Sequence, residues 1–199
     1  MYHDKRGLQL TAANQDAVDA FDAAVDEYLG QGREAGVLLK QLGNADPDMF
    51  MAHIVRGYFN LSPAQPHLLA PAAESLKRAQ AIQTSATPRE QMHLRVLEAW
   101  SAGNIAGACR ILEDVLLEYP HDILAFRLAH YLYFYTGELA RMRDSTARAM
   151  ANWSENDPGY GYVLGCRAFS LEENGQYGEA EPFGFGGGTT ERVKSCIIT

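Results

Sequence analysis

The sequence predicts an all-α fold built from stacked helical hairpins. Helix-forming residues dominate the 199-residue chain, and Val, Ile and Thr rarely fall in the alternating runs that are typical of strands. Apolar residues recur instead every three or four positions, as they do in Ile105, Cys109, Leu112, Leu116 and Tyr119. The breaks between such stretches are short and contain glycine or proline, which favours consecutive helices joined as hairpins.

Composition and charge limit the classes of function. A hydrophobic fraction of 47% and a charged fraction of 21% are typical of a soluble globular protein with one sizeable core. The net charge of -8 argues against sequence-independent nucleic-acid binding and against docking on anionic membranes, because both need clustered cations. We find neither an apolar run of about 20 residues nor a secretory signal. Three widely spaced cysteines, Cys109, Cys166 and Cys196, suit a reduced, cytoplasmic protein without a disulfide framework.

A fixed spacing of glycine, alanine, leucine and proline recurs along the chain. Two copies are complete, and the glycines Gly137 and Gly175 begin partial ones; the complete copies are Gly30, Ala35, Leu39 and Pro47, and Gly103, Ala108, Leu112 and Pro120. Glycine permits a helix-ending turn with positive φ, alanine lets two helices approach closely, and proline pre-sets the first turn of the next helix. These residue types at this spacing indicate tetratricopeptide-repeat-like hairpins, and so a right-handed α-α superhelical solenoid.

Two segments depart from the repeat. Between Pro47 and Pro88, the insertion "NLSPAQPHLL" carries two prolines, which predict a surface loop between the helices of the second hairpin. After Glu181, proline and several glycines occupy the expected last helix. Pro182 would cost roughly 3 kcal/mol there, and each glycine roughly 1 kcal/mol. We therefore expect a helical repeat domain over residues 1–181 and an irregular glycine-rich tail over residues 182–199.

Six phrases of the sequence occur between residues 7 and 181 in this order: "GLQLTAANQDAVDAFDAAVDEYL", "ADPDMFMAHIVRGYFNL", "TPREQMHLRVLEAW", "EYPHDILAFRLAH", "RMRDSTARAMANW" and "GYGYVLGCRAFSLEENGQYGEAE". Together they resemble the tetratricopeptide-repeat protein 38 family. The resemblance implies an all-helical solenoid and supplies no catalytic residues. Because members of that family continue with further repeats, we expect this chain to be a truncated, frame-disrupted or alternative form.

The C-terminal residues leave three interpretations open. The tail lacks a function of its own, or it is an interaction segment, or "CIIT" is a prenylation box in which Cys196 carries the lipid. Threonine is not the usual last residue of such a box. The helix "YGYVLGCRAFSLEE" lacks the polar cap that a solenoid needs at its end, so we also expect self-association through this helix.

The first helices of successive hairpins line the concave face of such a solenoid. The inward register positions there include two acids, Glu172 and Glu173, and eight candidate binding residues: His93, Trp100, Arg127, Tyr131, Phe134, Tyr135, Tyr162 and Phe169. Aromatic and arginine side chains contribute most binding energy at protein interfaces, so we predict a groove for a protein or peptide partner. Alternatively, the tyrosines pack between hairpins.

An enzymatic function is the second hypothesis. His53, His93 and His130 each fall on a first helix, and their convergence with Glu90 would create a metal or acid–base site in a fragment of a metal-dependent or hydrolase-like enzyme. The sequence has no HExxH motif, no nucleophile elbow and no phosphate-binding loop. We therefore favour a non-enzymatic scaffold that needs no cofactor and no metal.

Overall fold

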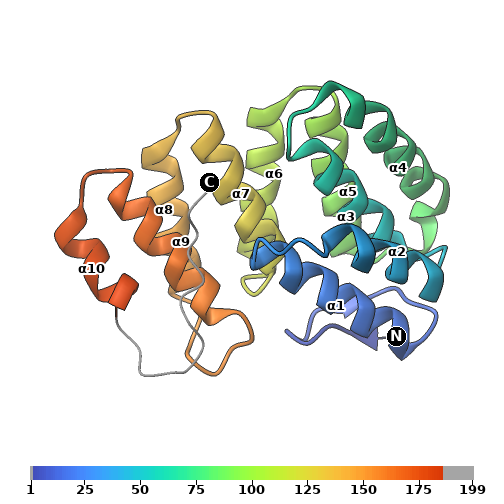
Figure 1. Ribbon diagram of the computed structural model, residues 1–199, viewed down its shortest axis with the longest axis horizontal. Helices are drawn as coiled ribbons and strands as arrows, with labels where there is room; N and C mark the ends of the chain where they lie inside the picture. The colour runs from blue at the N-terminus through green and yellow to red at the C-terminus, as the bar shows by residue number, and fades with distance from the viewer. Residues whose placement is uncertain (1, 186–199) are drawn as a thin grey trace. The chain divides into compact units, whose positions relative to one another are not determined.

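The computed structural model describes residues 2–185, and ten α-helices, two short 3₁₀ helices and one two-stranded sheet account for the regular structure in that range (Figure 1). The predicted all-α fold class is thereby confirmed. The chain divides into two compact units, Met1–Val115 and Leu116–Thr199, and the division falls within helix α6 (Ile105–Glu118). Within the described residues, no helix is both long and apolar enough to cross a membrane.

The first unit contains a short antiparallel sheet followed by helices that pack as neighbours. Helix α1 packs against α2, α3 packs against α4, and α5 contacts both α3 and α4. The elements are β1 (Tyr2–His3), β2 (Gln9–Leu10), α1 (Gln15–Leu29), α2 (Ala35–Ala45), α3 (Phe50–Leu61), η1 (Pro66–Leu68), α4 (Leu69–Ile82), η2 (Gln83–Ser85) and α5 (Pro88–Ser101). Large buried side chains, among them Phe50, Ile54, Tyr58 and Leu97, fill the core between these helices.

The predicted loop between α3 and α4 is present. Helix α3 ends at Leu61, and a turn follows in which Ala64 has a φ of 51°. Residues 63–67 are exposed, and the short η1 helix begins at Pro66. Both prolines of the insertion therefore lie outside the α-helices, where a missing N–H removes no hydrogen bond from a helix interior.

The N-terminus of α5 is fixed by local and distant contacts. Thr87 caps the helix by accepting a hydrogen bond from the backbone N–H of Glu90, and the Glu90 carboxylate accepts one from the Thr87 N–H at 2.7 Å. Pro88 is the first residue of the helix, a place where its missing N–H costs nothing. The Glu90 carboxylate also accepts from the backbone N–H of Thr11 at 2.9 Å and from its hydroxyl at 2.7 Å. Glu90 therefore joins the segment after β2 to the start of α5.

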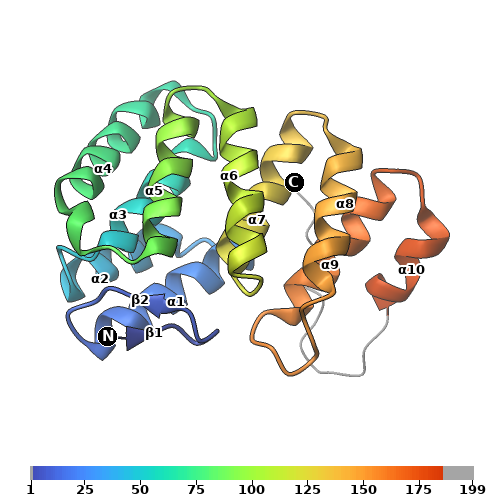
Figure 2. The same cartoon turned by 180° about the vertical axis from the view of Figure 1, so that it is seen from behind.

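The second unit repeats the hairpin arrangement. Helix α7 (Ile123–Tyr135) packs against α8 (Leu139–Met150) and α9 (Tyr160–Glu172), and α9 packs against α8 and α10 (Tyr177–Phe185). These helices appear in yellow to red in Figures 1 and 2. Asp122 caps α7 by accepting a hydrogen bond from the Ala125 N–H at 2.9 Å. Buried residues such as Phe126, Leu128, Met142 and Leu171 form the core of this unit.

Three of the four predicted turn glycines have the expected backbone. Gly103, Gly137 and Gly175 have φ values of 76°, 73° and 73°, and each lies just before the second helix of a hairpin. Their spacing is close to the roughly 34-residue period of a tetratricopeptide repeat. The residue five positions after each glycine, Ala108, Met142 or Ala180, is buried, as a helix-crossing position should be.

The first copy of the spacing does not have the same structure. Gly30 has a φ of -76°, and the residue with the left-handed backbone in this turn is Gln31, whose φ is 51°. Helix α2 begins only at Ala35, so this alanine is its half-buried first residue and not a crossing position. The longer connection shifts the helix by about three residues, and the fully buried leucine of α2 is Leu42 instead of Leu39. The match of the first copy to the repeat register was therefore wrong.

A tryptophan fixes the connections around α7 and α8. The indole N–H of Trp153 donates to the backbone carbonyl of Pro120 at 3.0 Å. The ring of His121 lies edge-on to Trp153 with centroids 5.1 Å apart, and His121 Nε2 lies 2.8 Å from the Asn152 carbonyl. These contacts give Trp153 a structural role at the N-terminal end of α7.

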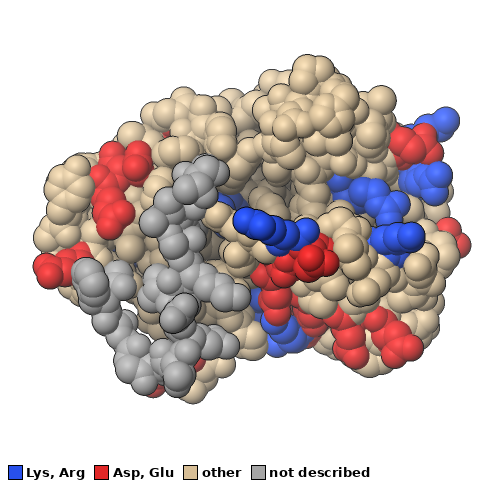
Figure 3. Space-filling view, viewed as in Figure 1, with Lys and Arg blue, Asp and Glu red and all other residues tan. Residues whose placement is uncertain are grey.

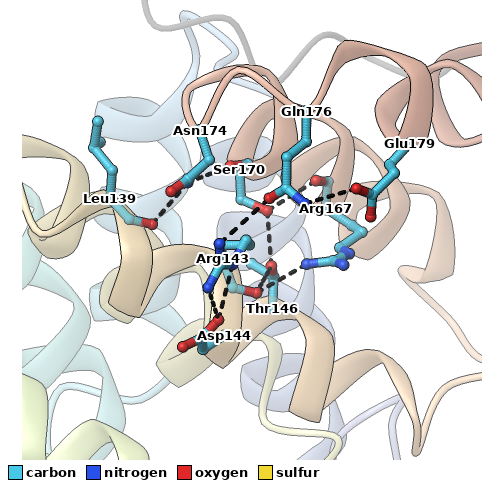
Figure 4. A network of polar contacts seen from close by, with 9 residues as sticks. All are labelled: Leu139, Arg143, Asp144, Thr146, Arg167, Ser170, Asn174, Gln176 and Glu179. Carbon is cyan, nitrogen blue, oxygen red and sulfur yellow. Dashed lines mark hydrogen bonds and ion pairs between the residues drawn. The ribbon is translucent and has the colours of Figure 1, made fainter.

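A network of polar contacts joins α8, α9 and α10 (Figure 4). The hydroxyls of Thr146 and Ser170 lie 2.8 Å apart and both are fully buried. The Asn174 amide donates to the backbone carbonyls of Leu139 at 2.9 Å and Ser170 at 2.7 Å. Asn174 thus provides a donor for the Ser170 carbonyl near the end of α9 and links this end to the start of α8.

We expect Asn174→Ala to lower the free energy of unfolding of the second unit by about 1–2 kcal/mol, because the Ser170 carbonyl at the end of α9 loses its side-chain donor and the hydrogen bond to the Leu139 carbonyl is lost. Urea denaturation followed by Trp153 fluorescence, in a Trp100→Phe background, measures this change. The exposed neighbour Glu173 is the matched control, and Glu173→Ala should change stability by less than about 0.5 kcal/mol. Equal effects of the two substitutions would contradict the role given to Asn174.

The predicted end of the helical domain at Glu181 is too early. Helix α10 continues to Phe185 and includes Pro182 in its second turn. This proline removes the N–H that would bond to the Gly178 carbonyl, and the helix nevertheless continues through it, contrary to the expectation that no helix forms there. The rest of the predicted irregular tail, with Cys196, lies outside the described residues.

Helix α9 is more covered than the sequence predicted. Val163, Cys166 and Leu171 are buried against α8 and α10, and Tyr162 and Phe169 are half-buried. At this end of the described chain, the large apolar residue that is exposed is Tyr177, on α10. The broad apolar surface of α9 on which the self-association prediction rested is therefore not present in the described part of the chain.

Candidate functional site

Four aromatic side chains from α7 and α9 meet on the surface of the second unit. The ring centroids of Tyr131 and Tyr135 lie 4.4 Å apart, and Phe134 lies 5.6 Å from Tyr135 and 5.2 Å from Phe169. Tyr135 is 57% exposed, and the other three residues are half-buried. We call these four residues the aromatic patch. They were predicted as binding residues from their register on successive first helices, and the structure brings them into contact.

The spacing along α7 explains how the patch forms. Tyr131, Phe134 and Tyr135 are three and four residues apart, so they lie on one face of the helix. Helix α9 contacts α7 and supplies Phe169 to the same face. Edge-to-face pairs of this kind, such as Phe134 with Phe169, are favourable beyond the area that they bury.

Two buried polar residues lie beside the patch. The Nη1 atom of Arg127 lies 3.2 Å from Nδ1 of His130, and the His130 ring lies 5.5 Å from the ring of Phe169. Because arginine is only a donor, Nδ1 accepts and the imidazole is neutral. Burial lowers the pKa of His130 to about 3, and the charge of Arg127 acts in the same direction. His130 therefore supports the patch as a neutral ring, and its pKa is too low for acid–base catalysis near pH 7.

An acidic edge adjoins the patch. Glu172 and Glu173 follow Phe169 by about one helical turn, and both are exposed. The face that presents the four rings is thus bordered by two carboxylates at the C-terminal end of α9.

The other predicted binding residues are less accessible. His93 is fully buried and Trp100 is 8% exposed, because the Tyr58 ring from α3 lies 6.0 Å from each of them. The Tyr58 hydroxyl donates to the His93 carbonyl at 2.8 Å and lies 3.1 Å from its Nδ1. These two positions belong to the core of the first unit, so the prediction that they line a binding surface was wrong. Arg127 is 5% exposed, and Tyr162 is half-buried on α9.

The three histidines of the enzymatic hypothesis contact different residues. His93 contacts Tyr58, His130 contacts Arg127, and His53 lies at the wall of a cavity beside Arg56. Glu90 caps α5 and binds Thr11. Across residues 2–185, no three His, Cys, Asp or Glu side chains are grouped so that they could hold a metal ion.

A cavity in the first unit between α2, α3 and α4 was not predicted from the sequence. Arg56 lies on its wall, and the signal that could have pointed to it is that Arg56 is the only Lys, Arg, Asp or Glu in α3, whose other residues are mostly buried and apolar. A charged residue on such a face has a specific reason to be there, such as a ligand or a buried partner.

No protein-family model matches this chain. The resemblance to the tetratricopeptide-repeat protein 38 family accordingly stays a prediction from the sequence.

Proposed function

We propose that this chain is a tetratricopeptide-repeat-like solenoid protein that binds a segment of another protein through the aromatic patch. The observation that carries the proposal is the contact of four aromatic rings on one surface, with Tyr135 57% exposed. Exposed aromatic side chains that touch one another are typical of the centre of protein interfaces, because they bury a large area at little cost in conformational entropy.

The repeat architecture is supported by the turn glycines and by the packing of the hairpins. Gly103, Gly137 and Gly175 share a left-handed conformation at nearly equal spacing. In the second unit, the first helices α7 and α9 contact each other, as expected for stacked repeats. Cys109 and Cys166 are buried and form no disulfide bond within the described residues, which suits a reducing compartment, so we propose a cytoplasmic location.

The chemistry of the patch favours one class of partner. Four aromatic rings favour an aromatic or large aliphatic side chain, and the carboxylates of Glu172 and Glu173 favour a neighbouring Lys or Arg. We therefore propose as ligand a peptide segment in which a large apolar residue lies next to a basic one.

Selection of peptides from a random-sequence library on the immobilised protein tests this proposal, followed by calorimetry on one selected peptide. We expect the selected peptides to share an aromatic or aliphatic residue beside Lys or Arg. Tyr135→Ala should weaken binding about tenfold, which corresponds to about 1.4 kcal/mol. It should leave folding nearly unchanged, because Tyr135 is largely exposed.

Tyr177→Ala is the matched control, because Tyr177 is 70% exposed on α10 in the same unit and lies outside the patch. Its affinity for the selected peptide should equal that of the unsubstituted chain. Peptides without the expected pattern, or equal losses for the two tyrosines, would contradict the proposal.

A further inference from the structure

A cavity of about 460 Å³ opens in the first unit between α2, α3 and α4. Its size falls within the range of about 300–1,000 Å³ that is typical of small-molecule sites. Leu39 and Ala52 contribute apolar surface, and the polar side chains on its wall are Lys40, Asn44, His53, Arg56, Asn60 and Arg78. Figure 3 shows Lys and Arg side chains gathered over this part of the unit.

The charges on the cavity wall are mainly positive, although the whole chain has a net charge of -8. Arg78 pairs with Glu74 at 3.0 Å, and both side chains are more than half exposed. Among the described residues, Lys40 and Arg56 form no ion pair with an acid. Two uncompensated cations therefore face the same hollow, and like charges so placed repel each other unless an anion lies between them.

Gly43 makes room for one of these cations. A Cβ atom built on Gly43 would lie 2.9 Å from Nη2 of Arg56, which is too close for a normal contact. That guanidinium nitrogen donates to the backbone carbonyl of Leu39 at 3.2 Å. Glycine in the interior of α2 costs roughly 1 kcal/mol relative to alanine. The glycine thus lets the guanidinium lie against α2 at the edge of the cavity.

His53 forms part of the same wall, so its ring is close enough to respond to a charge in the cavity. Its side chain is buried, and its Nδ1 has no hydrogen-bond partner among the described residues. Burial lowers the pKa of His53, and the charges of Arg56 and Arg78 act in the same direction. The Pro47 carbonyl and Asp48 act in the opposite direction. An anion in the cavity would favour the imidazolium form, so it would raise this pKa.

We propose that this cavity binds a phosphate monoester on a small organic molecule, with Arg56 and Lys40 as its main ligands and Asn44 and Asn60 as further donors. A phosphate monoester has a charge of about -1.5 to -2 at pH 7, which matches two uncompensated cations better than a single carboxylate does. The planar guanidinium of Arg56 suits two phosphate oxygens at once. The apolar wall leaves space for the organic part.

Titration of the isotope-labelled chain with O-phospho-L-serine, monitored by amide and imidazole resonances, tests this inference. L-serine and acetate are the comparison compounds. We expect shifts of amides in α2 and α3 with O-phospho-L-serine, at least tenfold weaker binding of acetate, and none of L-serine. The pKa of His53 should rise when the phosphate compound saturates the site. No rise, or acetate binding as well as the phosphate, would overturn the proposal.

Two variants locate the site. Arg56→Gln should weaken binding at least tenfold, and Gly43→Ala should weaken it about fivefold, because the new methyl group displaces the guanidinium. Alanine also favours the helix, so Gly43→Ala should leave the melting temperature unchanged or raise it. An unchanged or higher melting temperature shows that the variant loses affinity without losing its fold. Arg95→Gln, on the exposed face of α5, is the charge control and should bind within twofold of the unsubstituted chain. Unchanged affinity in both Arg56→Gln and Gly43→Ala would place the anion elsewhere.

Discussion

Glu90→Ala should lower the free energy of unfolding of the first unit by about 3 kcal/mol. The Glu90 side chain is fully buried and accepts three hydrogen bonds, two from Thr11 and one from the backbone of Thr87. Alanine leaves the N–H groups of Thr11 and Thr87 without this acceptor, while the Thr11 hydroxyl keeps only the Ser85 carbonyl at 3.3 Å. Each buried donor without an acceptor costs about 1–3 kcal/mol. Thr11 and Thr87 are half-buried, so water replaces part of what is lost and the total stays near the lower end.

Urea denaturation followed by Trp100 fluorescence, in a Trp153→Phe background, reports on this unit. Glu90→Gln keeps the shape and one acceptor oxygen, so its effect should be about half as large. Arg95→Ala, on the exposed face of the same helix, should change stability by less than about 0.5 kcal/mol. A loss below about 1 kcal/mol for Glu90→Ala would mean that the N-terminal segment does not depend on this carboxylate.

Acidification from pH 7 to pH 5 should remove about 2 kcal/mol of the stability of the second unit through His130 alone. The folded chain holds the pKa of His130 at about 3, mainly because the ring is buried and secondarily because Arg127 lies beside it. The unfolded chain has an ordinary histidine pKa of about 6.5 and so binds more protons below that pH. Stability is therefore fully present above about pH 6.5 and falls by about 1.4 kcal/mol for each pH unit below it.

Comparison of the unsubstituted chain with His130→Gln isolates this contribution, because all other titrating groups are common to both. The glutamine amide oxygen can accept the Arg127 hydrogen bond but does not titrate. We expect the loss of stability between pH 7 and pH 5, followed by Trp153 fluorescence in a Trp100→Phe background, to be about 2 kcal/mol smaller in the variant. Parallel pH profiles would show that His130 is protonated equally in the folded and unfolded chain.

The elements of the fold that sequence reasoning predicted best depend on short-range chemistry. Gly103, Gly137 and Gly175 mark turns because left-handed backbone favours glycine wherever it occurs. The turn predicted at Gly30 was wrong because the left-handed residue there is Gln31. A Gly–Ala–Leu–Pro spacing does not show whether the glycine or the residue after it has the left-handed backbone. The expectation that Pro182 ends the helix was wrong because α10 continues through this proline. The local cost of a proline inside a helix does not include the packing of α10 against α9.

The candidate site was predictable in part. Register on successive first helices correctly grouped Tyr131, Phe134, Tyr135 and Phe169, since residues three or four apart on a helix share a face. The same register could not predict that Tyr58 of α3 covers His93 and Trp100. Burial depends on what packs against a face, and register describes only the face itself.

The sequence by itself determined that this chain forms helices joined as hairpins, because apolar periodicity and turn chemistry act within a few residues of one another. Only the tertiary structure decided which residues have a second partner far along the chain. Glu90 binds Thr11 from 79 positions away, and Arg56 of α3 lies beside Gly43 of α2 at the edge of a cavity. Such pairings follow from how helices pack in space, and no local pattern encodes them.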